Sequence, residues 1–155
     1  MADPQPSAGP QLKIEKIYVK DLSLENPGAP QSFTLQAGPQ IEVSLRSRAE
    51  MIEDSVFECV LTITLTAKVD SKTLFLVEAA QAGVFRVTGV PLADMQPIMG
   101  IHCPAMLFPY IRETIADAVM RAGFPPVHLD PINFEAIYQQ QQLAAVEQPQ
   151  VAAQA

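Results

Sequence analysis

The sequence predicts an α+β domain in which a four-stranded antiparallel sheet has C-terminal helices on one face. Apolar and polar residues alternate with period two in four segments of the first ninety residues, and short turn signals separate these segments. After Pro91, apolar residues recur every three or four positions, as they do on one face of a helix. Strands that precede helices along a chain of 155 residues indicate a single domain whose helices are segregated from its sheet.

The strands are expected at residues 12–25, 40–50, 56–69 and 71–87. In the first segment, one parity carries Leu12, Ile14, Tyr18, Leu22 and Leu24. In the third, one parity carries Cys59, Leu61, Ile63, Leu65 and Ala67, and threonines occupy much of the other. Turn signals lie at residues 25–30, 50–54 and 70–72. Such short connections favour antiparallel pairing.

A long helix is expected over residues 104–122. Its apolar stripe is Leu107 or Phe108, Ile111, Ile115, Val119 and Ala122. Asp117 lies four residues before Arg121, a spacing that allows an ion pair on the polar side. Gly123 is a suitable C-terminal cap, and the prolines that follow stop the helix. A second helix is expected to begin at Asp130-Pro131 and to carry Phe134, Ile137 and Tyr138.

Both ends of the chain are expected to be flexible. Residues 1–11 are rich in Pro, Ala and Gly, and residues 143–155 form a low-complexity tail of Gln and Ala. Neither stretch has enough large apolar side chains to offset the entropy that is lost on ordering. The structured domain is therefore expected over residues 12–142.

The charge excludes several classes of partner. A net charge of −7 would repel nucleic acids and anionic membranes, so we expect neither as a partner. The N-terminal stretch lacks the apolar core of a signal peptide, and no segment reaches the ~18 apolar residues of a membrane span. The sequence indicates a cytoplasmic protein whose two cysteines are reduced.

The sequence offers one candidate nucleophile, Cys103, which follows His102. A cysteine attacks as its thiolate, and a helix N-terminus could favour that form. Adjacent side chains point apart, however, and Pro104 and the apolar residues after it favour a buried, inert thiol. His102 and His128 have no carboxylates at ligand spacing, and no phosphate-binding loop is present. We therefore expect no catalytic, cofactor-binding or metal-binding residues, and a small α+β enzyme that uses Cys103 is the alternative.

The fourth strand segment has apolar residues on both parities. Phe75, Val77, Ala79, Phe85 and Val87 share one face. Leu76, beside Glu78, lies on the opposite face, where a sheet covered on one side normally carries polar residues. Met106, Phe108 and Tyr110 similarly widen the apolar band of the long helix. One domain cannot easily bury all of this surface, which indicates self-association.

Four stretches of the sequence resemble a known family in their order and spacing. They are "KIYVKDLSLENPGAP", "QAGVFRVTGV", "HCPAMLFPYIRETI" and "FPPVHLDPINFEAIY", and they lie within residues 12–142. The chain resembles the bacterial protein-export chaperones of the SecB family. The resemblance implies an ATP-independent homotetramer, built as a dimer of dimers, that holds unfolded precursor proteins and passes them to the export ATPase SecA.

The resemblance also implies roles for individual residues. The SecA-binding surface of the family matches Asp21, Glu25, Leu76 and Glu78. Positions at which changes loosen the tetramer match Val77, Ala79 and Gln81. The client-binding groove is expected at Ile41, Val43, Leu45, Phe75 and Phe134. By the same resemblance, "HCPAMLFPYIRETI" begins a helix that is packed in the tetramer interface, so His102 and Cys103 are not a catalytic pair.

Overall fold

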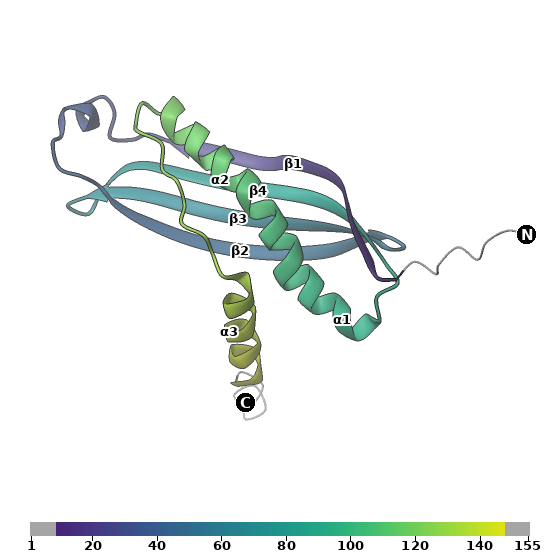
Figure 1. The fold of residues 1–155 in the computed structure, drawn as a ribbon. Helices are drawn as coiled ribbons and strands as arrows, with labels where there is room; N and C mark the ends of the chain where they lie inside the picture. The colour runs from purple at the N-terminus through teal and green to yellow at the C-terminus, as the bar shows by residue number, and fades with distance from the viewer. Residues whose placement is uncertain (1–8, 148–155) are drawn as a thin grey trace, which may run out of the picture.

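The computed structural model describes residues 9–147 and confirms the expected α+β architecture (Figure 1). The elements are β1 (Gln11–Glu25), β2 (Gln40–Glu53), β3 (Val56–Val69), β4 (Lys72–Thr88), α1 (Leu92–Pro97), the π-helical turn η2 (Ile98–His102), α2 (Cys103–Arg121) and α3 (Phe134–Glu147). A short 3-10 helix, η1 (Gln31–Thr34), follows β1. The strands form one antiparallel sheet in the order β1-β4-β3-β2.

Tight turns join the three strands that follow one another in the sheet. Asp70 and Ser71 have φ of 48° and 66°, as a two-residue hairpin turn of positive φ requires, and they confirm the turn expected at this position. The turn between β2 and β3 is shorter than expected, because β2 continues to Glu53 through a bulge after Met51.

The core lies between the sheet and α2, which crosses β4 and β3 on one face (Figure 1). The side chains on this face of β3 are fully buried, at Cys59, Leu61, Ile63, Leu65 and Ala67. They meet the expected stripe of α2, where Leu107, Ile111, Ile115 and Val119 are also fully buried. Gly83 of β4 allows close packing, since a Cβ there would lie 3.1 Å from the Leu107 side chain.

The first strand departs from simple alternation. Its pairing with β4 shifts register between Ile14 and Lys16 and again between Val19 and Asp21. A β-bulge adds one residue to a strand, so each bulge exchanges the parity that faces the helices. Tyr18 therefore lies on the face away from α2, and its placement on the apolar face of the strand was wrong.

The end of α2 follows the expected pattern. Gly123 has a φ of 94°, and its N–H donates to the carbonyl of Met120 at 3.0 Å. The N–H of Phe124 donates to the carbonyl of Val119 at 3.3 Å, which completes a Schellman cap. The expected ion pair between Asp117 and Arg121 is present on α2, at 2.9 Å.

The last helix differs from its sequence-based bounds at both ends. It begins at Phe134, because the Asn133 side chain accepts a hydrogen bond from the N–H of Ala136 at 3.0 Å and caps the first turn. The expected start at Asp130-Pro131 was therefore too early. The helix continues to Glu147, so residues 143–147, assigned to the tail, are helical. Leu143, Ala144, Ala145 and Glu147 are good helix formers, which accounts for the extension.

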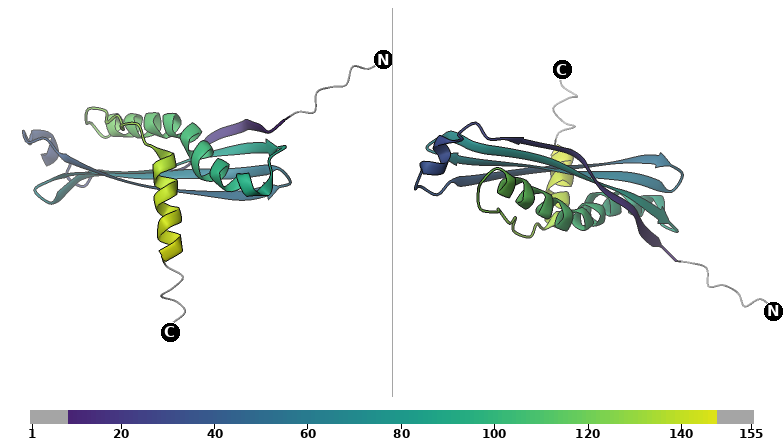
Figure 2. Two further views of the ribbon diagram at one scale, coloured as in Figure 1. Left: turned by 60° about the horizontal axis from the view of Figure 1, so that its bottom comes forward. Right: turned by 90° about the horizontal axis from the view of Figure 1, so that it is seen from above.

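Helix α3 leaves the helix layer and runs past the β2 edge of the sheet (Figures 1 and 2). Its contact with η2 is close: a Cβ at Gly100 would lie 2.6 Å from the ring of Tyr138. Among residues 9–147, no helix is long and apolar enough to cross a membrane. The flexible ends were predicted at residues 1–11 and 143–155, and of these, residues 1–8 and 148–155 lie outside the described residues.

Candidate functional site

The helices leave one face of the sheet uncovered, and we call it the outer face. The four expected SecA-binding residues lie together on the outer face. The strand register places Glu25 opposite Leu76, and it places Glu78 opposite Ser23, between Glu25 and Asp21 on β1. Asp21 and Glu25 are exposed, and Leu76 and Glu78 are half-buried. We call Asp21, Glu25, Leu76 and Glu78 the acidic patch.

Glu78 of the acidic patch contacts two neighbouring strands. It accepts a hydrogen bond at 2.9 Å from Thr64 Oγ1 of the neighbouring strand β3. The guanidinium of Arg46 on β2 lies 3.8 Å from its other oxygen. One carboxylate oxygen is thus held by the sheet, while the side chain is still 37% exposed and available to a partner.

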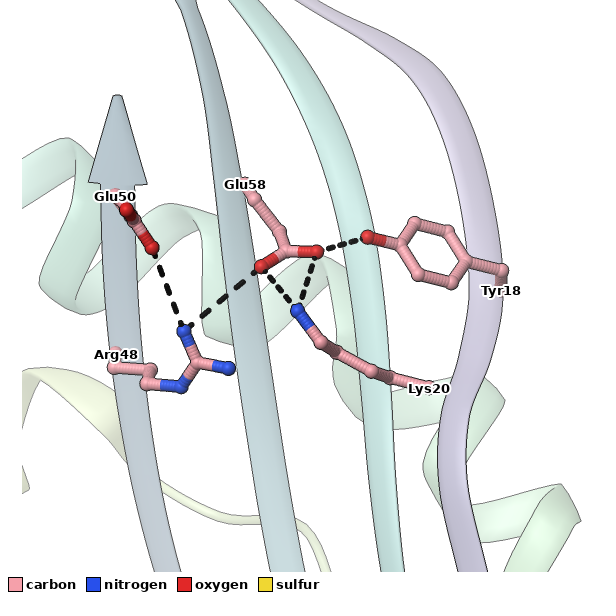
Figure 3. A network of polar contacts seen from close by, with 5 residues as sticks. All are labelled: Tyr18, Lys20, Arg48, Glu50 and Glu58. Carbon is pink, nitrogen blue, oxygen red and sulfur yellow. Dashed lines mark hydrogen bonds and ion pairs between the residues drawn. The ribbon is translucent and has the colours of Figure 1, made fainter. Parts of the chain in front are cut away.

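A network of polar contacts lies beside the acidic patch on the outer face (Figure 3). The Glu58 carboxylate accepts hydrogen bonds from the hydroxyl of Tyr18 and from Lys20 Nζ, the latter at 2.7 and 2.9 Å. Arg48 lies 3.9 Å from Glu58 and from Glu50. The bonds from Lys20 and Tyr18 lower the pKa of Glu58, and burial together with the bond to Glu58 raises the pKa of Tyr18 to about 12.

This network could not be predicted from the sequence pattern, because its β1 members depend on the bulges. A bulge between Val19 and Asp21 lets both Tyr18 and Lys20 reach Glu58 on the outer face. Strict alternation places Tyr18 and Lys20 on one face with Leu22, whereas the structure places Leu22 on the helix side, opposite Ala79.

The residues expected to affect assembly lie on the opposite face, beneath α2. Val77 and Ala79 are fully buried, and Gln81 is 4% exposed. Gln81 Nε2 donates to the carbonyl of Tyr18 at 3.2 Å, and Thr114 of α2 donates to Gln81 Oε1 at 3.1 Å. Gln81 therefore connects β1, β4 and α2 within one chain.

An apolar groove of about 410 Å³ opens on the helix side, between η1, the start of β2 and the segment that follows α2. Phe124 lies at its centre, with ring centroids 5.2 Å from Phe33 and 4.6 Å from Phe75. Of the expected client-binding residues, Ile41 and Phe75 line this groove. The exposed fraction of Ile41 is 39%, so an incoming chain can reach it.

The other expected client-binding residues lie outside the groove lining. Val43 and Leu45 continue along the helix side of β2, where Val43 is 45% exposed and Leu45 is half-buried. Phe134 is 6% exposed and packs edge-on against Phe108, with centroids 5.9 Å apart. Val43 and Leu45 extend the apolar surface, whereas Phe134 anchors α3 in the core.

Sequence reasoning missed most of the groove lining. The missed residues in the connecting segments include Phe33, Leu35, Phe124, Pro125, Pro126 and Val127. They lie in segments without strand or helix period, so alternation could not place them on a face. The available signal was composition: Phe33 and Leu35 are large apolar residues in a polar connecting segment, and they are 50% and 51% exposed.

The thiols do not support the alternative of a cysteine enzyme. Cys103 is fully buried at the start of α2, and burial is the main cause that raises its pKa to about 12. Burial likewise raises the pKa of Cys59 to about 12. Both thiols are therefore protonated at neutral pH and are poor nucleophiles. Within residues 9–147, no group of three or more His, Cys, Asp or Glu side chains could hold a metal ion.

Comparison with known proteins identifies the family. Residues 5–145 match the family model described as preprotein translocase subunit SecB. The chain is 54% identical to the protein-export protein SecB of Chromobacterium violaceum over 138 residues, which cover 89% of this chain and 92% of that protein. It is 53% identical to the protein-export protein SecB of Nitrosomonas eutropha, with 94% and 92% covered.

This chain belongs to the SecB family. A solved structure shares the SecB-family fold at low sequence identity: the SecB-like chaperone Rv1957 of Mycobacterium tuberculosis, in complex with a ChAD peptide from the Rv1956 HigA1 antitoxin. The TM-score is 0.66 and the identity 16%, over 78% of this chain and 90% of the other. The SecB fold is thus retained where the sequence has diverged widely.

Proposed function

We propose that this chain is a cytoplasmic, ATP-independent holdase that binds unfolded precursor proteins and delivers them to SecA. Membership of the SecB family makes it a protein-export chaperone. The observation that carries the mechanism is the division of the sheet into two faces: an apolar groove on the helix side and the acidic patch on the outer face. Clients and SecA would then bind at the same time without competing for one surface.

Client binding is proposed along the groove and the helix side of β2. The groove offers aromatic and aliphatic side chains that accept many apolar sequences. Strand β2 lies at an edge of the sheet, so its outward N–H and C=O groups are available to pair with an extended chain. Backbone pairing is independent of sequence, which suits a chaperone with diverse clients. The M. tuberculosis SecB-like chaperone, whose solved structure is a complex with a peptide, supports this role.

Assembly into a homotetramer, a dimer of dimers, is supported by apolar surface on β1 and α2. Edge strand β1 exposes Ile14, Val19, Leu22 and Leu24 by 38–47%. Helix α2 exposes Tyr110 and Met120 by 45% and 50%. Surface of this kind marks protein interfaces. Val77, Ala79 and Gln81 would act on assembly indirectly, by setting the position of α2 on the sheet.

SecA docking is proposed at the acidic patch. Three carboxylates around Leu76 suit a basic, partly apolar segment. Exposed ion pairs contribute only ~0.2–1 kcal/mol each, so docking is expected to be moderate in affinity and to weaken as salt rises. Such affinity allows the chaperone to be released after it has handed over its client.

The variant Glu78→Lys tests this docking surface. It replaces an attractive charge by a repulsive one, so we expect SecA binding to weaken about 2- to 30-fold at low salt. Client holding and oligomer mass should stay unchanged, because Glu78 faces away from α2. Asp130→Lys is the matched control, since it changes an exposed charge equally on the segment between α2 and α3. Wild-type affinity in a calorimetric titration of Glu78→Lys would show that SecA docks elsewhere.

A further inference from the structure

The middle of the outer face contains a shallow trough of about 250 Å³. Small side chains of the two central strands line it, Val60 and Thr62 of β3 and Ala80 of β4. The register aligns Asp21, Ala80, Thr62 and Arg46 in one row across the four strands. Long side chains of the edge strands therefore flank a low centre.

The cations that line the trough differ in how far they are neutralised. Lys20 Nζ lies 2.7 and 2.9 Å from the two oxygens of Glu58, so its charge is closely paired. Arg46 is 3.8 Å from Glu78, and Arg48 is 3.9 Å from both Glu58 and Glu50, distances too long for ordinary hydrogen bonds. The two arginine side chains are 72% and 57% exposed. Their guanidinium groups can therefore bind a further acceptor.

The trough adjoins the acidic patch, because Asp21 and Glu78 belong to both. The charge on the outer face thus changes sign over one or two rows of residues. A partner segment of uniformly positive charge would be attracted by the carboxylates and repelled by Arg46 and Arg48. Repulsion of this kind selects for a segment that carries both signs of charge.

We infer that the segment docking on the acidic patch also carries a carboxylate, which binds in the trough between Arg46 and Arg48. The inference rests on the proposed function, since it concerns the same docking surface. A guanidinium group can bind a carboxylate through two parallel hydrogen bonds, so two exposed arginines give a site selective for an acidic side chain. The small side chains of Thr62 and Ala80 leave room for that side chain to reach both.

The strand geometry sets the spacing of charges in the partner. Arg46 lies in the row of Ala80 and Arg48 in the row of Ala82, one and two rows beyond Glu78. Rows on one face are about 6.6 Å apart, because each residue of a strand rises about 3.3 Å. An extended partner segment is therefore expected to carry its acidic residue about two to four positions from the basic residue that meets Glu78.

The test is the double variant Arg46→Gln/Arg48→Gln, titrated by calorimetry with SecA from the same organism. Removing two positive charges makes the outer face more acidic, so a uniformly basic partner would bind more tightly. A segment with a carboxylate in the trough should instead bind about 2- to 30-fold more weakly, since two ion pairs are lost. Lys13→Gln/Lys16→Gln is the control, because it removes the same charge from exposed positions of β1.

The sign of the change separates the outcomes. Weaker binding by the arginine variant, with little change in the lysine control, supports the inference. Tighter or unchanged SecA binding by the arginine variant overturns the inference. Weakened SecA binding by Glu78→Lys in the same series would then show that the docking surface itself is correct. Wild-type affinity in both the arginine variant and Glu78→Lys overturns the docking surface and the inference together.

Discussion

Replacing Gln81 by leucine tests how the core of one chain controls assembly. Gln81 accepts a hydrogen bond from Thr114 of α2 and donates one to the carbonyl of Tyr18 on β1. Each bond contributes ~0.5–1.5 kcal/mol net, so Gln81→Leu should lower the free energy of unfolding by ~1–3 kcal/mol. For a domain of this size, each kcal/mol corresponds to about 2–4 °C in Tm.

The same variant should loosen the proposed tetramer, because α2 loses its polar link to the sheet. Sedimentation across a range of protein concentrations measures the shift toward dimer, and thermal unfolding measures the loss of stability. Thr114→Val is a milder comparison: of the two Gln81 bonds it removes the one to α2, together with the contact of the Thr114 hydroxyl with the carbonyl of Tyr110, and it should produce part of both effects. A lower Tm with unchanged mass at every concentration would refute the link between α2 position and assembly.

Two further predictions concern the groove and the outer-face network. Phe124→Ala removes the central ring of the aromatic cluster. The variant should suppress the aggregation of an unfolded client less well, and its affinity for SecA should stay unchanged. Full suppression of aggregation would contradict the assignment of the groove. The contacts of Glu58 lower its pKa in the folded protein. The stabilisation of the fold that they provide is therefore present above the ordinary pKa of 4.5, and it is lost as the pH falls through the lower pKa of the folded state. Below pH 4.5, the Tm of Glu58→Gln should therefore fall less with pH than the Tm of the wild type. Equal falls in Tm would contradict the stabilising role of this network.

The strands of the buried core could be predicted because burial fixes their parity. In β3, Leu61, Ile63 and Leu65 alternate with polar residues and all face α2. A slip of one residue there would expose the apolar set, so the sequence pattern determines the register. The acidic patch was named from the family resemblance, and its role stays a prediction; Asp21 and Glu25 lie on one face because no bulge separates them in β1.

The remaining features depend on contacts that no periodic pattern encodes. The bulges of β1 are set by pairing with β4, so alternation alone placed Tyr18 on the wrong face. The start of α3 depends on one capping bond at Asn133, which competed with the equally plausible Asp130. The groove is built by Phe33 and Phe124 from connecting segments, which the fold brings together from distant parts of the sequence.

The second bulge of β1 connects the two faces for which we propose functions. From the helix side, Gln81 binds the carbonyl of Tyr18; from the outer face, Glu58 binds the hydroxyl of Tyr18 and the ammonium group of Lys20. These contacts hold the bulge in place, and the bulge sets the parity by which Asp21 faces outward. A shift of one residue would turn Asp21 toward the helices and divide the acidic patch. Loss of the Gln81 contact should therefore weaken SecA docking as well as assembly, although Gln81 lies on the opposite face from the patch.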